Sequence, residues 1–159
     1  MPATAVFIHG LESSSHGTKA QWLKNRFPDM LVSDFRGSLC VRMAQLDRLL
    51  AGRQDLILVG SSFGGLMAAV YALENERRLS RVVLLAPALN FREFGRYRKR
   101  STGVPCLLYA GRHDSLCPLE KIIPPARDTF TDLSVHITDD DHFLRTTFPA
   151  IDWLRLLQG

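Results

Sequence analysis

The stretch Leu56-Ile-Leu-Val-Gly-Ser-Ser-Phe-Gly-Gly-Leu66 has the pattern of a buried strand, a tight turn and the start of a helix. Its centre, Gly60-Ser-Ser-Phe-Gly64, fits Gly-x-Ser-x-Gly with Ser62 in the middle. Glycine at the flanking positions lets the chain pass closely through a sharp strand-to-helix turn, which leaves the serine hydroxyl exposed. We therefore expect Ser62 to be a nucleophile. The alternative is a plain glycine-rich turn, because the pattern also occurs by chance.

Short apolar runs alternate with segments of helical periodicity along the whole chain. Besides the run that begins at Leu56, apolar runs predict strands over residues 3–8, 30–32, 81–86, 104–110 and 133–137. Apolar spacing predicts helices over residues 18–27, 39–51, 66–75 and about 119–123. Pro124-Pro125 is expected to interrupt or restart the last of these. A final helix is expected after Pro149, with Ile151, Leu154 and Leu157 on one face. The alternation favours an α/β fold with a mostly parallel, roughly six-stranded sheet and helices on both faces. A chain of 159 residues suits a single domain, 1–159.

The composition places the chain among globular proteins, with 46% hydrophobic and 23% charged residues. No apolar run approaches the ~20 residues that cross a bilayer, and the N-terminus lacks the pattern of a signal peptide. The cysteines Cys40, Cys106 and Cys117 have no metal-type spacing and suit a reducing compartment. We therefore expect a cytoplasmic protein with no membrane partner, and a buried Cys106 because it lies in an apolar run.

Three further polar residues, His9, Asp114 and His142, follow predicted strands. Carboxyl ends of parallel strands meet at one edge of a sheet, so we expect these residues to share that edge with Ser62. A serine hydroxyl needs a neutral imidazole to take its proton and a carboxylate to orient the imidazole. His142 suits the base and Asp114 the orienting acid. The alternatives are a surface histidine beside an acidic turn and a helix N-cap, respectively.

Other residues are weaker candidates for these roles. Asp139, Asp140 and Asp141 are so near His142 in sequence that reaching its ring is awkward. The side chain of His9 is expected to be structural, bonded to the loop backbone. A metal site built from His113, Asp114 and His142 is a remote option.

The net charge of +4 is concentrated in one short stretch, which contains Arg92, Arg96, Arg98, Lys99 and Arg100. The simplest interpretation is a solvated loop. The alternative is a patch that attracts an anionic substrate group or a nucleic acid. No recognised nucleic-acid motif accompanies the stretch, so we do not expect a nucleic-acid partner.

The order Ser62, Asp114, His142 is the order of the α/β-hydrolase architecture, and the sequence resembles that superfamily. The resemblance rests on Phe7-Ile-His-Gly-Leu11, Asp34-Phe-Arg-Gly37, Val59-Gly-Ser-Ser-Phe-Gly-Gly65, Gly111-Arg-His-Asp114 and Asp141-His-Phe143. More narrowly, His9-Gly-Leu-Glu-Ser-Ser-Ser15 with Lys19-Ala-Gln21, and the serine turn itself, are similar to small bacterial esterases.

The resemblance implies an acyl-enzyme mechanism with Ser62 as nucleophile, His142 as base and Asp114 as orienting acid. It also implies an oxyanion hole made by the backbone N–H groups of Leu11 and Phe63. The mechanism uses no cofactor and no metal. Compared with the full family fold, the first two strands are expected to be missing. The helical cap is also expected to be missing, because the segment 87–104 is too short to form one. An open, shallow site follows from this.

These observations favour a serine hydrolase that cleaves carboxylic esters of small acyl groups, so the expected partner is a small-molecule ester or thioester. One alternative is a thioesterase acting on a phosphate-bearing acyl carrier. Another is a catalytically idle α/β scaffold that binds an anionic partner through the basic stretch 92–100.

Overall fold

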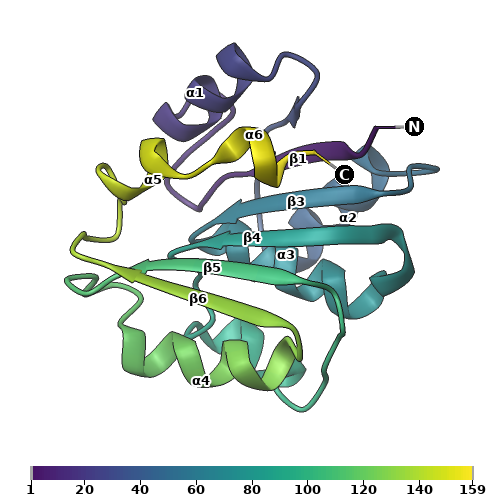
Figure 1. Ribbon diagram of the computed structural model, residues 1–159. Helices are drawn as coiled ribbons and strands as arrows, with labels where there is room; N and C mark the ends of the chain where they lie inside the picture. Colours follow the sequence, from purple (N-terminus) through teal and green to yellow (C-terminus); the bar gives the residue numbers. More distant parts are fainter. Residues whose placement is uncertain (1, 159) are drawn as a thin grey trace.

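The computed structural model describes residues 2–158, which contain a six-stranded sheet with the strand order β2-β1-β3-β4-β5-β6 (Figure 1). Every neighbouring pair is parallel, which confirms the predicted α/β architecture. The strands are β1 (Thr4–Ile8), β2 (Leu31–Val32), β3 (Leu56–Ser61), β4 (Leu79–Leu85), β5 (Cys106–Gly111) and β6 (Leu133–Thr138).

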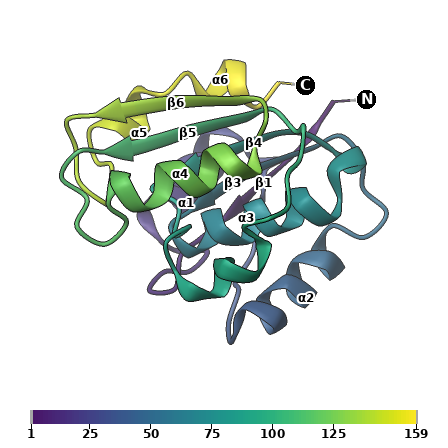
Figure 2. The ribbon, with the colours of Figure 1, turned by 90° about the horizontal axis from the view of Figure 1, so that it is seen from below.

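Helices cover both faces of this sheet (Figures 1 and 2). One face carries α1 (Thr18–Arg26), α5 (Thr147–Ala150) and α6 (Trp153–Leu156). The other carries α2 (Leu39–Leu49), α3 (Phe63–Glu74) and α4 (Leu119–Thr129). Two short 3-10 helices, η1 (Glu76–Arg78) and η2 (Arg92–Tyr97), precede and follow β4.

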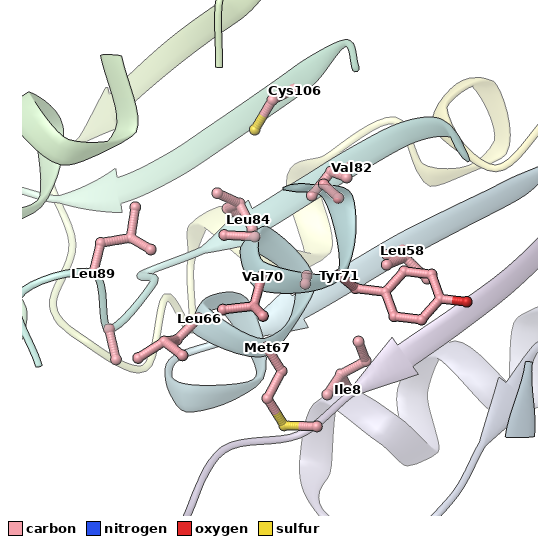
Figure 3. Packing of buried hydrophobic residues seen from close by; sticks show 14 of the residues in the cluster. Ile8, Leu58, Leu66, Met67, Val70, Tyr71, Val82, Leu84, Leu89 and Cys106 are labelled. Atoms are coloured by element: carbon pink, nitrogen blue, oxygen red, sulfur yellow. The ribbon is translucent and has the colours of Figure 1, made fainter. Parts of the chain in front are cut away.

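The central strand β3 is apolar on both faces because each face is covered. Leu58 packs into the core on the side of α2, α3 and α4, whereas Val59 packs into the core beside α1, α5 and α6. Helix α3 is buried from Phe63 to Ala72. Figure 3 shows Val70 and its neighbours in α3 meeting side chains of the central strands, including Leu84. This packing fixes the start of α3, and therefore the turn that holds Ser62.

Helix α4 differs from the prediction, because it continues to Thr129 although Pro124 and Pro125 lie inside it. Each proline removes a backbone N–H donor, which ordinarily ends a helix. Here Ile122, Pro125 and Ala126 are buried against the sheet. Tertiary packing therefore maintains a helix that the local sequence disfavours.

The C-terminal segment also differs, because the single helix expected after Pro149 is replaced by α5 and α6. Pro149 lies within α5, and the Asp152 side chain accepts the backbone N–H of Arg155 at the start of α6. The helical phase restarts at this cap. As a result Trp153 is buried, whereas Leu154, expected on the apolar face, is 63% exposed.

No helix within residues 2–158 combines the length and the apolar character needed to cross a membrane. Cys106 is buried, as predicted from its apolar run, and so is Cys117. Cys40, on α2, is exposed.

Candidate active site

Ser62 lies in a sharp turn between β3 and α3, with φ 55° and ψ −116°. A non-glycine residue is rarely found in this region of backbone space, and such strain is common where a catalytic side chain is exposed. The flanking glycines allow the turn to pack. A Cβ at Gly60 would lie 2.3 Å from the Gly64 carbonyl oxygen, and one at Gly64 would lie 1.9 Å from the Ile8 carbonyl oxygen. The Gly-x-Ser-x-Gly pattern is therefore a requirement of backbone packing.

The structure brings Ser62, His142 and Asp114 into one hydrogen-bonded chain, although they are far apart in sequence. The Ser62 Oγ lies 3.1 Å from His142 Nε2, and His142 Nδ1 lies 2.7 Å from Asp114 Oδ2. A proton on Nδ1 donated to the carboxylate leaves the Nε2 lone pair facing the hydroxyl. This geometry allows the imidazole to act as a general base toward the serine.

Asp114 is held by the backbone of its own turn. Its Oδ1 accepts the N–H groups of Leu116 at 2.9 Å and Cys117 at 2.7 Å, while its Oδ2 contacts His142. Asp114 is not a helix N-cap, because the N-cap of α4 is Pro118, but its side chain does hold the turn that precedes that helix while it contacts His142. Since the Asp114 side chain is fully buried and that of His142 is 17% exposed, the carboxylate lies beneath the ring.

The loop that carries His142 is fixed by Asp140. The Asp140 carboxylate accepts the N–H groups of Asp141, Thr146 and Thr147 and the hydroxyl of Thr147, at 2.8–3.1 Å. Burial acts to raise its pKa, but these hydrogen bonds outweigh burial and hold the pKa below the ordinary value. Asp140 was considered only as an acid for His142, and the structure gives it this different contact set.

Lys19 and Gly111 also position this loop. Lys19, on α1, donates from Nζ to the Phe143 carbonyl at 2.6 Å. A Cβ at Gly111 would lie 2.2 Å from the Asp140 carbonyl oxygen, so glycine permits the loops after β5 and β6 to meet. Sequence reasoning missed both supports. The only feature of the sequence that could have indicated them is that each residue lies in a segment that resembles the α/β-hydrolase family.

The remaining acidic candidates do not bond to His142. Asp139 pairs with His113 Nε2 at 2.6 Å on the surface, and Asp141 accepts the N–H of Phe143. His113 is thus bonded to Asp139, and the structure does not group it with Asp114 and His142 in the metal site considered above.

A different potential donor cluster, Asp114, Cys117 and His142, has its donor atoms within 4.8 Å of one another. Burial, reinforced by the Asp114 charge, raises the pKa of Cys117 to about 12. The thiol thus keeps its proton, and the other two groups are bonded to each other. The cluster therefore consists of the hydrogen-bonded Asp114–His142 pair with a buried, protonated thiol beside it.

His9 organises the loop after β1, as expected for a structural histidine. It is 2% exposed, its Nε2 accepts the Phe35 N–H at 2.9 Å, and its Nδ1 lies 2.7 Å from the Gly10 carbonyl oxygen. Burial lowers its pKa, which favours the neutral ring that accepts this bond. The loop passes close to the serine, since a Cβ on Gly10 would lie 3.3 Å from the Ser62 Cβ.

The two N–H groups expected to form an oxyanion hole, those of Leu11 and Phe63, donate to no acceptor within residues 2–158. By contrast, the Ser62 carbonyl accepts three N–H groups, from Gly65, Leu66 and Ala88. A free N–H at the first residue of a helix suits a developing negative oxygen.

Two hollows flank Leu11. The polar hollow, of about 360 Å³, is lined mainly by polar residues of the loops after β1 and β2, among them Ser13, Asp34 and Arg36. The apolar groove, of about 880 Å³, lies between α2, α3 and η2, and Leu11 and Phe63 are among the residues that line it. Its volume is typical of small-molecule sites.

The basic stretch 92–100 does not form one continuous patch. Arg98 pairs with Asp128 at 3.2 Å, and Arg100 donates to the Leu73 carbonyl. Arg92 and Arg96 line the apolar groove together with Glu93. Its charges are therefore divided between different surroundings.

Comparison with known proteins supports the fold. The sequence model of a family described as the alpha/beta hydrolase fold matches residues 10–94. A search of curated proteins gave no match.

Among similar solved structures is a protein from Agrobacterium vitis S4, proposed to be a hydrolase, with 18% identity and a TM-score of 0.82 over 99% of this chain and 88% of that one. An esterase from Exiguobacterium antarcticum has 13% identity and a TM-score of 0.75, covering 96% of this chain and 92% of that one. Est1E from Butyrivibrio proteoclasticus, solved with ferulic acid, has 15% identity and a TM-score of 0.73, covering 98% of this chain and 89% of that one.

Proposed function

Because the chain belongs to the α/β-hydrolase fold family, we propose that it is a serine hydrolase that cleaves carboxylic esters through an acyl-enzyme intermediate. The observation that carries this proposal is the Asp114–His142–Ser62 chain, with contacts of 2.7 and 3.1 Å. An ester is favoured over other acyl substrates because two proteins of similar fold, from Exiguobacterium antarcticum and Pyrococcus furiosus, are named as esterases.

In the proposed reaction the Ser62 Oγ attacks the ester carbonyl carbon while His142 Nε2 takes the hydroxyl proton. Asp114 stabilises the imidazolium that forms. The carbonyl oxygen becomes an oxyanion and accepts the N–H groups of Leu11 and Phe63. When this intermediate collapses, His142 returns its proton to the leaving alcohol, and an acyl-serine remains. A water, deprotonated by His142, then releases the acid.

A thioester would react through the same groups, so thioesterase activity is the alternative within this mechanism. The specific support for a phosphate-bearing acyl carrier was the concentration of charge at residues 92–100. Since two of these arginines are engaged by Asp128 and by a backbone carbonyl, that support is weakened. An ester is therefore the substrate class to test first.

The test compares hydrolysis of nitrophenyl acetate and labelling by a fluorophosphonate in wild type, Ser62→Ala and Ser61→Ala. Ser61→Ala is the matched control, since it removes the neighbouring hydroxyl from the same turn. We expect Ser62→Ala to abolish labelling and to lower kcat by a factor of about 10³ or more, and Ser61→Ala to keep both. A folded wild type that neither labels nor hydrolyses would contradict the proposal and favour the binding scaffold.

A further inference from the structure

The apolar groove shares two lining residues with the proposed oxyanion hole. These are Leu11 and Phe63, whose N–H groups would hold the oxyanion. The groove runs between α2, which contributes Leu39 and Met43, and η2, which contributes Tyr97. An ester whose carbonyl oxygen is bound between Leu11 and Phe63 would therefore have one of its two arms next to this groove.

The position of His142 decides which arm that is. The leaving alcohol must lie beside His142, because this residue protonates it. The lining residues come from the segments 37–47, 63–74 and 92–97 together with Leu11, and none comes from the loop that carries His142. The arm in the groove is therefore the acyl chain, and the alcohol lies on the other side of the serine.

The charges around the groove do not select an anionic end group. Arg92 and Arg96 are accompanied by Glu93, Glu74 and Asp47, so both signs are represented in similar number. The recognising surface is the apolar lining, which gains free energy from each methylene that it removes from water.

We propose that the apolar groove binds a linear aliphatic acyl chain, so that the enzyme hydrolyses octanoyl esters with higher kcat/KM than acetyl esters. This inference rests on the proposed serine hydrolase function. It differs from the expectation of small acyl groups, which rests on the shortness of the segment 87–104 and the open, shallow site that follows from it. That segment contributes η2, and η2 forms one wall of the groove.

Two tryptophan substitutions on α2 test the proposal. Ala44 is exposed and lines the groove, whereas Arg48, one turn further along, is exposed and lies outside it. Ala44→Trp is expected to lower kcat/KM for nitrophenyl octanoate by at least about tenfold while leaving nitrophenyl acetate within about twofold. Arg48→Trp is expected to change neither value.

A chemical block on the wild-type chain avoids any effect of substitution on folding. Cys40 is exposed and lines the groove, whereas Cys106 and Cys117 are buried. Alkylation of Cys40 with a bulky maleimide should therefore lower octanoate hydrolysis selectively. In the Cys40→Ser variant, the same treatment should leave octanoate hydrolysis at the level of the untreated variant.

Three results would overturn the inference. An octanoate-to-acetate ratio unchanged by both the Ala44→Trp substitution and the maleimide would exclude the groove as the acyl site. A selective loss for octyl acetate, with nitrophenyl octanoate spared, would place the alcohol in the groove instead. A folded wild type that hydrolyses neither ester and does not label with the fluorophosphonate would contradict the proposed function itself, and this inference with it.

Discussion

Asp114 contacts His142 with one carboxylate oxygen and its own turn with the other. The first contact, to His142 Nδ1, is 2.7 Å, and the second, from the Cys117 N–H, is also 2.7 Å. Rotation of the carboxylate would break both contacts, and its burial prevents water from replacing them. The orientation of the His142 ring is therefore set by the turn after β5, on a different loop from the ring itself.

Replacing Asp114 with asparagine tests this relationship. The amide oxygen can still accept the N–H groups of Leu116 and Cys117, so the fold should persist. The amide NH₂ then faces His142 Nδ1, which favours the tautomer with the proton on Nε2, where it cannot accept from Ser62. We expect kcat for nitrophenyl acetate to fall by a factor of about 10⁴.

The matched control for this prediction is Asp139→Asn, because Asp139 is an acidic neighbour of the site that bonds His113 rather than His142. Its kcat should stay near that of the wild type. Near-normal activity in Asp114→Asn, with circular dichroism showing a folded chain, would mean that another group orients the imidazole.

The pH dependence of stability should reveal the hydrogen bonds of Asp140. Its pKa in the folded state lies below the ordinary value, so the unfolded chain binds its proton more readily. The stability from this carboxylate is therefore fully present above its unfolded pKa and is lost as pH falls through the folded pKa. Asp140→Asn should lower the free energy of unfolding at neutral pH, and this difference should shrink as pH falls below the ordinary pKa of an aspartate.

Urea unfolding of wild type and Asp140→Asn across this range measures the difference. A difference that stays constant with pH would argue that the carboxylate charge contributes nothing. Because Asp140 also fixes the loop that carries His142, we expect kcat in this variant to fall at neutral pH, while Asp139→Asn again serves as the control.

The close contact at the serine turn gives a prediction about folding. A Cβ at Gly64 would lie 1.9 Å from the Ile8 carbonyl oxygen. Neither atom could rotate away, because the backbone fixes the positions of both. Gly64→Ala should destabilise the chain by more than about 3 kcal/mol. Gly95→Ala is the matched control, because nothing lies within 4 Å of its added Cβ, and it should change stability by less than about 0.5 kcal/mol. Similar urea midpoints for the two variants would disprove the packing argument.

The fold and the three aligned side chains were predictable because each depends on a local pattern. Ser62, Asp114 and His142 each follow an apolar run, and the parallel arrangement brings the ends of such runs to one edge. The helix predicted after Pro149 has the wrong buried positions, because the Asp152 cap starts a new helix there. Helix α4 was cut short in the prediction because burial of Pro125 outweighs its local preference.

The supports of the site could not be predicted in the same way. The bond from Lys19 to the Phe143 carbonyl spans 124 positions, and no spacing rule connects the two residues. The apolar groove draws on four separate segments, so its existence depends on how α2 and η2 pack beside α3. Such features arise from tertiary packing and cannot be predicted from short-range periodicity.

The reactivity of the thiols tests whether the turn of Asp114 stays closed in solution. Cys117 is fully buried, and burial together with the Asp114 charge raises its pKa to about 12, so almost no thiolate exists at neutral pH. Burial likewise raises the pKa of Cys106. Iodoacetamide should therefore modify the native chain at Cys40 alone, and should modify all three cysteines in urea. Mass spectrometry of tryptic peptides measures this, and modification of native Cys117 at a rate near that of Cys40 would mean that the turn holding the Asp114 carboxylate opens readily.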